Sequence, residues 1–435
     1  MTVEPRRVET AAETAIAERL AARATGPFAG QRLAAAARLA ASGLPGRRVE
    51  AYRYTDLRAA LRTLAPLPGA TDAAAAKALF EATFPWRDLG ARRVVFVDGR
   101  WSAALSDLDG LDGAVEVVRL ADADAAGRSV VGALAERVDD PVLALNTGLF
   151  DDGVVVRITA GATVAVPLAI VHLVTAPAAV AVRHAVEVGE GATVTVLESH
   201  AGAEAVAYQT NTAVELGVGE GARVTWARLQ EDGEAALHLA SLVVEIAKGG
   251  RLDYLSVGFG AALARQQGFV RFVGPDARAA FEAVVHVDGR RHIDNTLVVD
   301  HLVPDCVSTE RFRSVVADEA TSVVQGRINV AQAAQRTDAR MMTQALLTGD
   351  GAEAINKPEL EIFADDVQCA HGATAGRLDE TALTYMRTRG IPRPLAEAML
   401  LEAFLAETID RLPDEAVAEA LKARLATRLA ARGGN

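Results

Sequence analysis

The chain has 435 residues, of which half are hydrophobic and 23% are charged, the composition of a globular protein long enough for several domains. Its 45 basic residues against 57 acidic residues give a formal charge of −12, so no general electrostatic attraction to nucleic acid is expected. Only two cysteines are present, Cys306 and Cys369, which excludes a disulfide framework and favours a reducing, cytoplasmic compartment.

The N-terminal region is predicted to be helical. Its first residues, MTVEPRRVETAAE, lack the apolar core of a secretory signal. Residues 8–41 are rich in alanine with leucines at helical spacing, and Gly43-Leu44-Pro45-Gly46 ends the predicted helix. A second helix is expected from Asp72 to Thr83, before Pro85.

The sequence then changes to short strands. The stretch RRVVFVDGRWSAAL contains two short runs around Asp98-Gly99, the strongest local signal for a β-hairpin. Residues 161–182 contain no Asp, Glu, Lys or Arg and reach the length of a membrane span. Their two prolines and many valines favour short buried strands over one helix, so no membrane segment is expected.

A turn followed by a strand recurs along the middle of the chain. GATV begins at Gly161 and Gly191, GARV at Gly221 and GGRL at Gly249, which are intervals of 30, 30 and 28 residues. Weaker echoes begin at Asp276, Asp305 and Gly351. Such a period without intervening helices predicts a parallel β-helix, with two coils in each repeat. An antiparallel β-sandwich is the alternative, because turn spacing alone does not separate the two folds.

The C-terminal residues return to a helical period. Asp379 is expected to cap a helix that reaches Arg389 and ends at Gly390 and Pro392. A longer helix starts near Pro394, and a last one after Pro413, each with leucines along one face. Helices therefore occupy both ends of the chain, where a solenoid needs caps.

The stretch LEIFADDVQCAH, read as one extended strand, places Cys369 and His371 on the same face. A thiol and an imidazole so placed can hold a soft or borderline metal such as zinc or iron. Two ligands do not complete a structural zinc site, and the sequence does not bring Cys306 near as a third, so an open site shared with another chain is the sharper hypothesis. A catalytic thiol and an ordinary buried cysteine are the alternatives.

Asp365 and Asp366 indicate a different class of function, because paired carboxylates catalyse sugar cleavage and many β-helix proteins act on polysaccharides. On one strand, however, the two side chains would point to opposite faces. No phosphate-binding loop motif is present, so the chain is not expected to bind nucleotide. The seven other histidines, which cluster only at His286, His292 and His301, are expected to form hydrogen bonds at strand ends and turns rather than to bind metal.

Several longer segments resemble the SufB/SufD family, the scaffold subunits of the SUF iron–sulfur cluster assembly machinery. The C-terminal signature of the family is similar to KPELEIFADDVQCAHGATAGRLDE (357–380) and YMRTRGIPRPLAEAMLLEAF (385–404). Further matches are HIDNTLVVDHLVPDCVSTERF (292–312) and VVQGRINVAQAAQRTDAR (323–340). GLPGRRVEAYRYTDL (43–57) and DGRWSAALSDL (98–108) are similar to SufD-type rather than SufB-type members.

The resemblance implies a mainly β fold, a right-handed parallel β-helix core with N-terminal and C-terminal α-helical regions. We place these regions at residues 1–90, 91–376 and 377–435. The resemblance also implies a non-catalytic scaffold that pairs with a SufB-like paralogue and binds a SufC-like ABC ATPase, which hydrolyses the ATP. A sulfur donor protein would act on this complex indirectly.

The resemblance also implies site residues. His371 matches the position that builds the nascent cluster with a cysteine of the SufB-like subunit, and Cys369 matches the cysteine of the same motif, in a secondary role. A transient iron–sulfur cluster at that subunit interface is therefore implied, while the cluster type and any flavin in the complex stay open. The segment similar to the ATPase-docking region contains Gly390, Ile391, Leu400 and Phe404.

Overall fold

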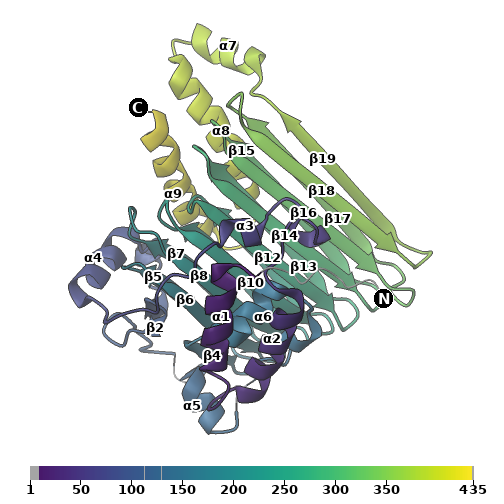
Figure 1. Ribbon diagram of the computed structural model, residues 1–435. Helices are drawn as coiled ribbons and strands as arrows, with labels where there is room; N and C mark the ends of the chain where they lie inside the picture. Colours follow the sequence, from purple (N-terminus) through teal and green to yellow (C-terminus); the bar gives the residue numbers. More distant parts are fainter. Residues whose placement is uncertain (1–8, 112, 129, 434–435) are drawn as a thin grey trace, which may run out of the picture.

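A β-solenoid forms the centre of the protein in the computed structural model, which describes residues 9–111, 113–128 and 130–433 (Figure 1). The expectation of no secretory signal rests on MTVEPRRVETAAE, and the first eight of these residues lie outside these ranges. Two sheets wind through about eight turns, and each turn adds one strand to each sheet.

Sheet A has ten strands and sheet B has nine. In spatial order, sheet A contains β19 (Gln368–Gly376), β17 (Asp338–Leu347), β15 (Val307–Val316), β13 (Arg278–Val287), β11 (Arg251–Gly258), β9 (Arg223–Glu231), β7 (Thr193–Gly202), β5 (Leu168–Val174), β1 (Arg92–Val97) and β2 (Arg100–Trp101). Sheet B contains β18 (Glu353–Ile362), β16 (Thr321–Val330), β14 (His292–His301), β12 (Leu263–Phe272), β10 (Leu237–Ile246), β8 (Gln209–Val218), β6 (Ala179–Val188), β4 (Asp152–Ile158) and β3 (Val115–Arg119).

Neighbouring strands are parallel except in two pairs, β1 with β2 and β3 with β4. The predicted parallel β-helix is therefore confirmed, and the antiparallel sandwich is wrong. The uncharged segment 161–182 forms β5 and the start of β6 with a break between them, as its prolines predict. Among the described residues, no helix is both long enough and apolar enough to cross a membrane.

The turns before the strands of sheet A explain the period. Gly161, Gly191, Gly221 and Gly249 all have φ between 61° and 71°, a left-handed conformation that costs glycine no steric energy. The turns also bond to one another, since the Gly191 N–H donates to the Glu220 carbonyl at 2.7 Å. Each repeat is one coil of two strands, so the prediction of two coils per repeat is wrong.

The weaker echoes of the repeat are right at Asp276 and Asp305, which both have φ of 62°. The echo predicted at Gly351 is wrong, because this residue precedes β18, a strand of sheet B. The next left-handed turn residue before a strand of sheet A is Arg336, with φ of 60°. The predicted hairpin is confirmed, because Asp98 and Gly99 have φ of 49° and 78° and connect β1 to the antiparallel β2.

The main hydrophobic core lies between the two sheets. In parallel register, residues of the same face stack directly above one another, as Val194, Val224, Leu252 and Ala279 do in successive strands of sheet A. All four are buried in the same cluster. Burial by stacking explains why the strands are rich in valine and why they need neighbours on both sides.

The N-terminal helices cover the outer face of sheet B, and α6 contacts three of its strands (Figure 1). They are α1 (Ala11–Ala21), α2 (Ala29–Ser42), α3 (Leu57–Ala60), α4 (Ala73–Thr83), α5 (Leu120–Ala125) and α6 (Pro141–Leu149), of which α4 lies beside sheet A. The single alanine-rich helix predicted for residues 8–41 is wrong, because Gly26 with φ of 88° lies between α1 and α2. The helix predicted from Asp72 to Thr83 is confirmed as α4, with Asp72 as its N-cap, and the stop at Gly43 is confirmed.

The C-terminal helices are α7 (Glu380–Thr388), α8 (Arg393–Ile409) and α9 (Glu415–Gly433). The Asp379 side chain accepts the Thr381 N–H at 2.8 Å, and Gly390 has φ of 85°, so both predicted ends of α7 are confirmed. The leucine faces of α8 and α9 are buried on the outer face of sheet A, where Leu405 and Leu421 join the same cluster as Leu229.

Candidate functional site

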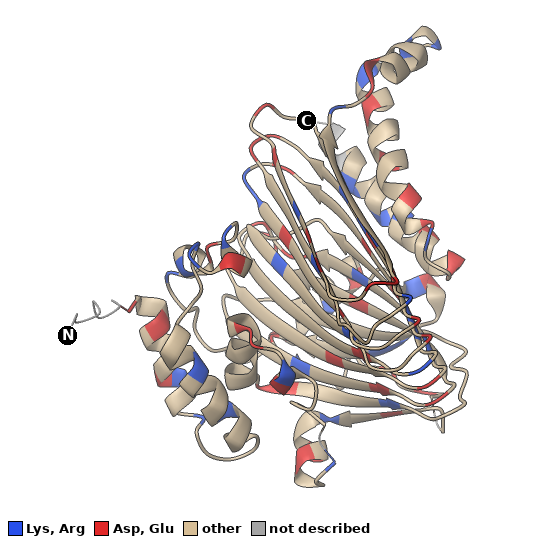
Figure 2. Cartoon of the chain, turned by 90° about the vertical axis from the view of Figure 1, so that its right-hand side faces the viewer, with Lys and Arg blue, Asp and Glu red and all other residues tan. Residues whose placement is uncertain are grey.

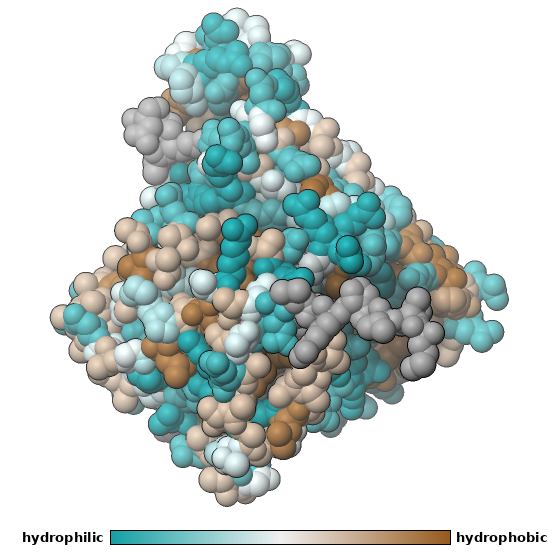
Figure 3. Space-filling model, in the orientation of Figure 1, coloured by the Kyte–Doolittle hydropathy of each residue, from teal (hydrophilic) through white to brown (hydrophobic). Residues whose placement is uncertain are grey.

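The C-terminal end of the solenoid is open. Within the described chain, β19 pairs only with β17, and β18 pairs only with β16. Every described residue of these two strands is half-buried or exposed, whereas β16 is mostly buried. Figure 3 shows apolar side chains toward the right-hand edge of the molecule, over the last strands, and Phe363 is 66% exposed. An unpaired strand edge with exposed apolar groups is a ready template for another chain.

We predicted that the stretch LEIFADDVQCAH forms one strand, and this prediction is wrong. It contains the end of β18, a turn at residues 363–367, and the start of β19. Asp365 and Asp366 lie exposed in that turn, where the Asp366 carbonyl accepts the Arg336 N–H at 2.6 Å. Cys369 and His371 nevertheless share one face, because both lie in β19 two residues apart.

That shared face points toward the interior of the solenoid at its open end. Cys369 is paired with Ala339 and His371 with Met341 of β17, and Cys369 packs against the main core. His371 is exposed and Cys369 is half-buried. Burial raises the pKa of the Cys369 thiol above its usual value, so without a metal it is mainly protonated near neutral pH. The pair offers two ligands and leaves the others to come from outside the chain.

Cys306 does not join this pair. It is fully buried in the turn before β15, and its Sγ lies 3.4 Å and 3.5 Å from two backbone carbonyls. Burial raises the pKa of its thiol to about 11. Cys306 is therefore a structural residue and not the third ligand that the sequence left open.

Two further side chains lie behind His371 in the same inward-facing column. Glu310 of β15 is paired with Met341 of β17, which is paired in turn with His371. Met341 reaches across to Gly326 of sheet B, where a β carbon would overlap its thioether. Met341 thus separates Glu310 from the open end. The sequence analysis missed both residues, although each precedes the next by one repeat.

Glu310 is fully buried, and the Ser308 hydroxyl is close enough to its carboxylate to hydrogen-bond with it. Ser308, on the same face, is 3.0 Å from His301. Burial raises the pKa of Glu310 to about 8. The pKa of Glu310 is higher in the folded state than in the unfolded state, so the folded state binds this proton more tightly. The proton therefore contributes its full stabilisation below about pH 4.5, and the stabilisation is lost as the pH rises through 8.

The wild type should lose stability on the order of 4 kcal/mol between pH 5 and pH 8.5 because Glu310 ionises, and we expect Glu310→Gln to remove this loss. Glutamine keeps the shape of the protonated acid but cannot ionise. The measurement is urea denaturation at both pH values. Glu234→Gln, at an exposed turn position, is the control and should match the wild type. Equal pH dependence in Glu310→Gln and wild type would contradict the prediction.

Of the predicted ATPase-docking residues, Gly390 and Ile391 lie at the α7–α8 corner and Leu400 and Phe404 lie further along α8. Gly390 is exposed in the turn, and Ile391 and Leu400 are half-buried. Phe404 faces its own solenoid, since the Arg313 guanidinium lies 4.9 Å from its ring. The structure therefore gives Phe404 a clear role in holding α8 on sheet A.

Other side chains of this corner, which the sequence analysis missed, are the more exposed. Tyr385 is 61% exposed, Leu395 54% and Met399 45%. Leu395 and Met399 are four residues apart and so lie on one face of α8. A cleft of about 460 Å³ between α7, α8 and the end of sheet A lies beside them, lined by charged residues that include Arg377, Glu380, Arg393 and Glu397. Figure 2 shows basic and acidic residues interspersed over the view, without one extended basic face.

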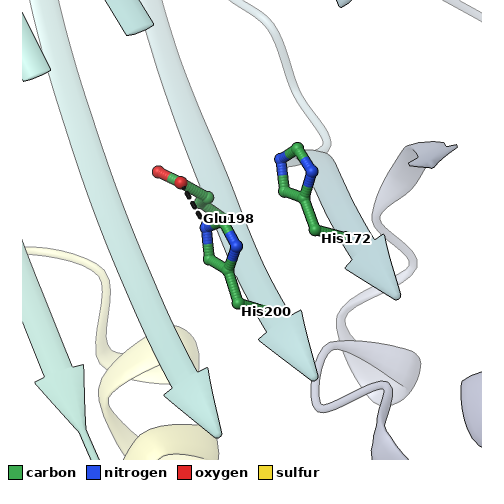
Figure 4. A group of neighbouring side chains, drawn as sticks. All are labelled: His172, Glu198 and His200. Atoms are coloured by element: carbon green, nitrogen blue, oxygen red, sulfur yellow. Dashed lines mark hydrogen bonds and ion pairs between the residues drawn. The ribbon is translucent and has the colours of Figure 1, made fainter. Parts of the chain in front are cut away.

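The histidines fall into two groups. His292 and His301 are the first and last residues of β14 and bond to Thr55 and Ser308, as expected of histidines at strand ends. By contrast, His172 and His200 lie inside the solenoid with Glu198 (Figure 4). The sequence does contain a signal for this group, because His172 and His200 are 28 residues apart, one period of the repeat, and so stack in register.

Comparison with known proteins agrees with this architecture. A family model described as "SUF system FeS cluster assembly, SufBD core domain" matches residues 172–404, and one described as "SufBD protein N-terminal region" matches residues 14–170. The iron–sulfur cluster assembly protein SufD of Escherichia coli is 30% identical over 399 residues, which cover 89% of this chain and 90% of that protein. An iron–sulfur cluster assembly SufBD family protein of Synechocystis is 28% identical over 401 residues, 88% and 87% of the two chains.

Proposed function

The chain belongs to the SufB/SufD family of SUF-system iron–sulfur cluster assembly proteins and is of its SufD type, and from that premise we propose that it is a non-catalytic scaffold subunit. In this proposal it pairs with a SufB-like paralogue and binds a SufC-like ABC ATPase, which hydrolyses the ATP. The complex works in the cytoplasm, in keeping with two cysteines that are both free.

The observation that carries the proposal is the open end of the solenoid with Cys369 and His371 on its last strand. The Gln368 N–H donates to the carbonyl of Thr337, the residue before β17, so the N–H groups of the odd-numbered residues of β19 point to the free edge. In β18 the alternation places Pro358, which has no N–H, at the free edge instead. The edge of β19 is therefore the better one to pair with the paralogue.

A nascent iron–sulfur cluster is the cargo of this interface. Cys369 and His371 provide a thiolate and an imidazole, ligands that suit iron, and the paralogue supplies the remainder. A cluster held by two chains can be released when they separate. Because burial keeps Cys369 protonated, we assign the exposed His371 the leading role and Cys369 the secondary one.

The ATPase docks at the α7–α8 corner in this proposal. Gly390 and Ile391 form the turn, Phe404 holds α8 on sheet A, and the half-buried Leu400 with the exposed Leu395 and Met399 makes the contact. α8 and α9 are also part of the hydrophobic core on sheet A, so ATP-driven movement of the ATPase would reach the solenoid directly.

The test is reconstitution of the complex from this chain, a SufB-like paralogue and a SufC-like ATPase, followed by measurement of iron, acid-labile sulfide and visible absorption. We expect His371→Ala to assemble normally but to lose at least about 90% of cluster formation, because an exposed ligand contributes little to folding. Unchanged cluster formation would remove His371 from the proposal.

Met399→Asp is the matched variant at the other surface. It should lose the ATPase while the paralogue still co-purifies, because a charge replaces an exposed apolar contact. If neither protein co-purifies with the wild-type chain, the scaffold proposal fails as a whole. Point variants are preferable to deleting the C-terminal helices, since deletion would expose the core cluster that they cover on sheet A.

A further inference from the structure

The interior of the solenoid contains a second group of side chains that can bind a metal, located on β5 and β7 and not on β19. His172 of β5 is paired in register with His200 of β7, and Glu198 lies two residues before His200 on the same face. One ligand atom from each of the three residues lies within 4.8 Å of the others (Figure 4). We propose that His172, Glu198 and His200 bind one divalent transition-metal ion such as Zn²⁺ inside the solenoid.

The donor set fits such an ion. Two imidazole nitrogens and one carboxylate oxygen are the ligands of an open zinc site, with bonds of about 2.0–2.2 Å. The three ligand atoms already lie within 4.8 Å of one another, so the side chains must bring them closer together to fit these bonds. Mg²⁺ and Ca²⁺ prefer six or more oxygen ligands, so the site should reject them.

The two histidine rings make few hydrogen bonds that a bound ion would have to replace. The rings stack at 4.5 Å with an interplanar angle of 5°, so they do not hydrogen-bond to each other. His172 has one polar contact among the described residues, a long one of 3.3 Å to Nε2 of His184. His200 is 2.6 Å from the Glu198 carboxylate, a bond that the ion would replace.

The surroundings orient the carboxylate. Trp226 Nε1 donates to the second oxygen of Glu198 at 3.0 Å, the kind of outer contact that fixes a ligating carboxylate. The Arg228 guanidinium lies 3.4 Å from the first oxygen. Its positive charge opposes a cation, so the bound ion must gain most of its affinity from the two nitrogen donors, which again favours a transition metal.

This inference is independent of the proposed scaffold function, because Cys369 and His371 lie on the last strand and take no part in the site. The test therefore uses a Cys369→Ala/His371→Ala background, in which the exposed pair cannot contribute. The protein is purified from cells supplied with Zn²⁺ or Co²⁺ and washed with a chelator. Metal content and Co²⁺ visible absorption are then measured.

We expect about one ion per chain, a Co²⁺ spectrum with nitrogen ligands, and loss of both in His172→Gln. His301→Gln removes another buried histidine of the interior, bonded to Ser308, and should keep the ion. Absence of metal, or its retention in both His172→Gln and His200→Gln, would overturn the proposal. If His172→Gln does not fold, the thermal stability of the wild type is the test instead. The metal is removed by unfolding and refolding the protein in the presence of a chelator, and the metal-bound protein should have the higher melting temperature. Equal melting temperatures would overturn the proposal.

Discussion

Replacement of Asp294 by alanine is expected to lower the free energy of unfolding by about 3–5 kcal/mol. The Asp294 carboxylate contacts the guanidinium of Arg265, and both side chains are almost completely buried, at 0% and 1% exposure. Without the carboxylate, a buried cation is left unpaired. Arginine cannot escape this cost by losing its proton, because its pKa is too high.

The same arginine holds the N-terminal region on the solenoid. Its guanidinium lies 4.1 Å from the centre of the Tyr52 ring and donates to the Ala51 carbonyl at 2.9 Å. Thr55 also hydrogen-bonds to Asp294. Loss of Asp294 therefore weakens the docking of residues 50–55 on sheet B as well as the ion pair itself.

Urea denaturation at neutral pH measures the effect, as a lower midpoint at an unchanged slope. Asp253→Ala is the control: Asp253 pairs with Arg251 on the surface of sheet A, where the arginine is 46% exposed, and should cost less than about 1 kcal/mol. The double variant Arg265→Met/Asp294→Leu should recover most of the loss, since it leaves no unpaired charge. Equal losses in Asp294→Ala and Asp253→Ala would contradict the prediction.

The fold could be predicted from the sequence because the repeated turns show where each coil of the solenoid begins. A left-handed residue is needed once in each coil, and glycine at 161, 191, 221 and 249 marks that position with a residue type that can be recognised. The turns could not be recognised from the sequence where a residue other than glycine takes the same left-handed conformation, as Arg336 does. For that reason the chain from β18 to β19 was predicted as one strand, although Asp366 lies one period after Arg336.

The candidate site was predictable only in part. That Cys369 and His371 share a face follows from alternation within one strand, which the sequence displays. Contacts between turns are harder to predict, because Glu310 and His172 meet residues one repeat further along the chain, and only the exact register of the strands shows which residues those are. The open edge of β19 was not predicted: the helix after Asp379 shows where the strands end, but not that β19 and β18 border the solvent as separate last strands of two sheets.

The second large expected effect concerns that edge. Ala373→Pro should weaken binding to the SufB-like paralogue by about 10-fold to 100-fold while leaving the thermal stability of the single chain nearly unchanged. The Ala373 N–H points away from β17, so proline removes a donor only from the free edge and keeps the ladder inside the chain. Pro358 of β18 already occupies such a position without disturbing its strand.

Calorimetric titration of the paralogue with each variant measures the affinity. Ala373→Ser is the matched control, because it keeps the N–H and changes the exposed side chain only slightly, and it should bind like the wild type. Equal affinity for the proline and serine variants would mean that the paralogue does not add a strand to β19. The partner would then have to reach His371 through side chains alone, and the free backbone edge would stay exposed in the complex, which is an aggregation hazard that paired sheets avoid.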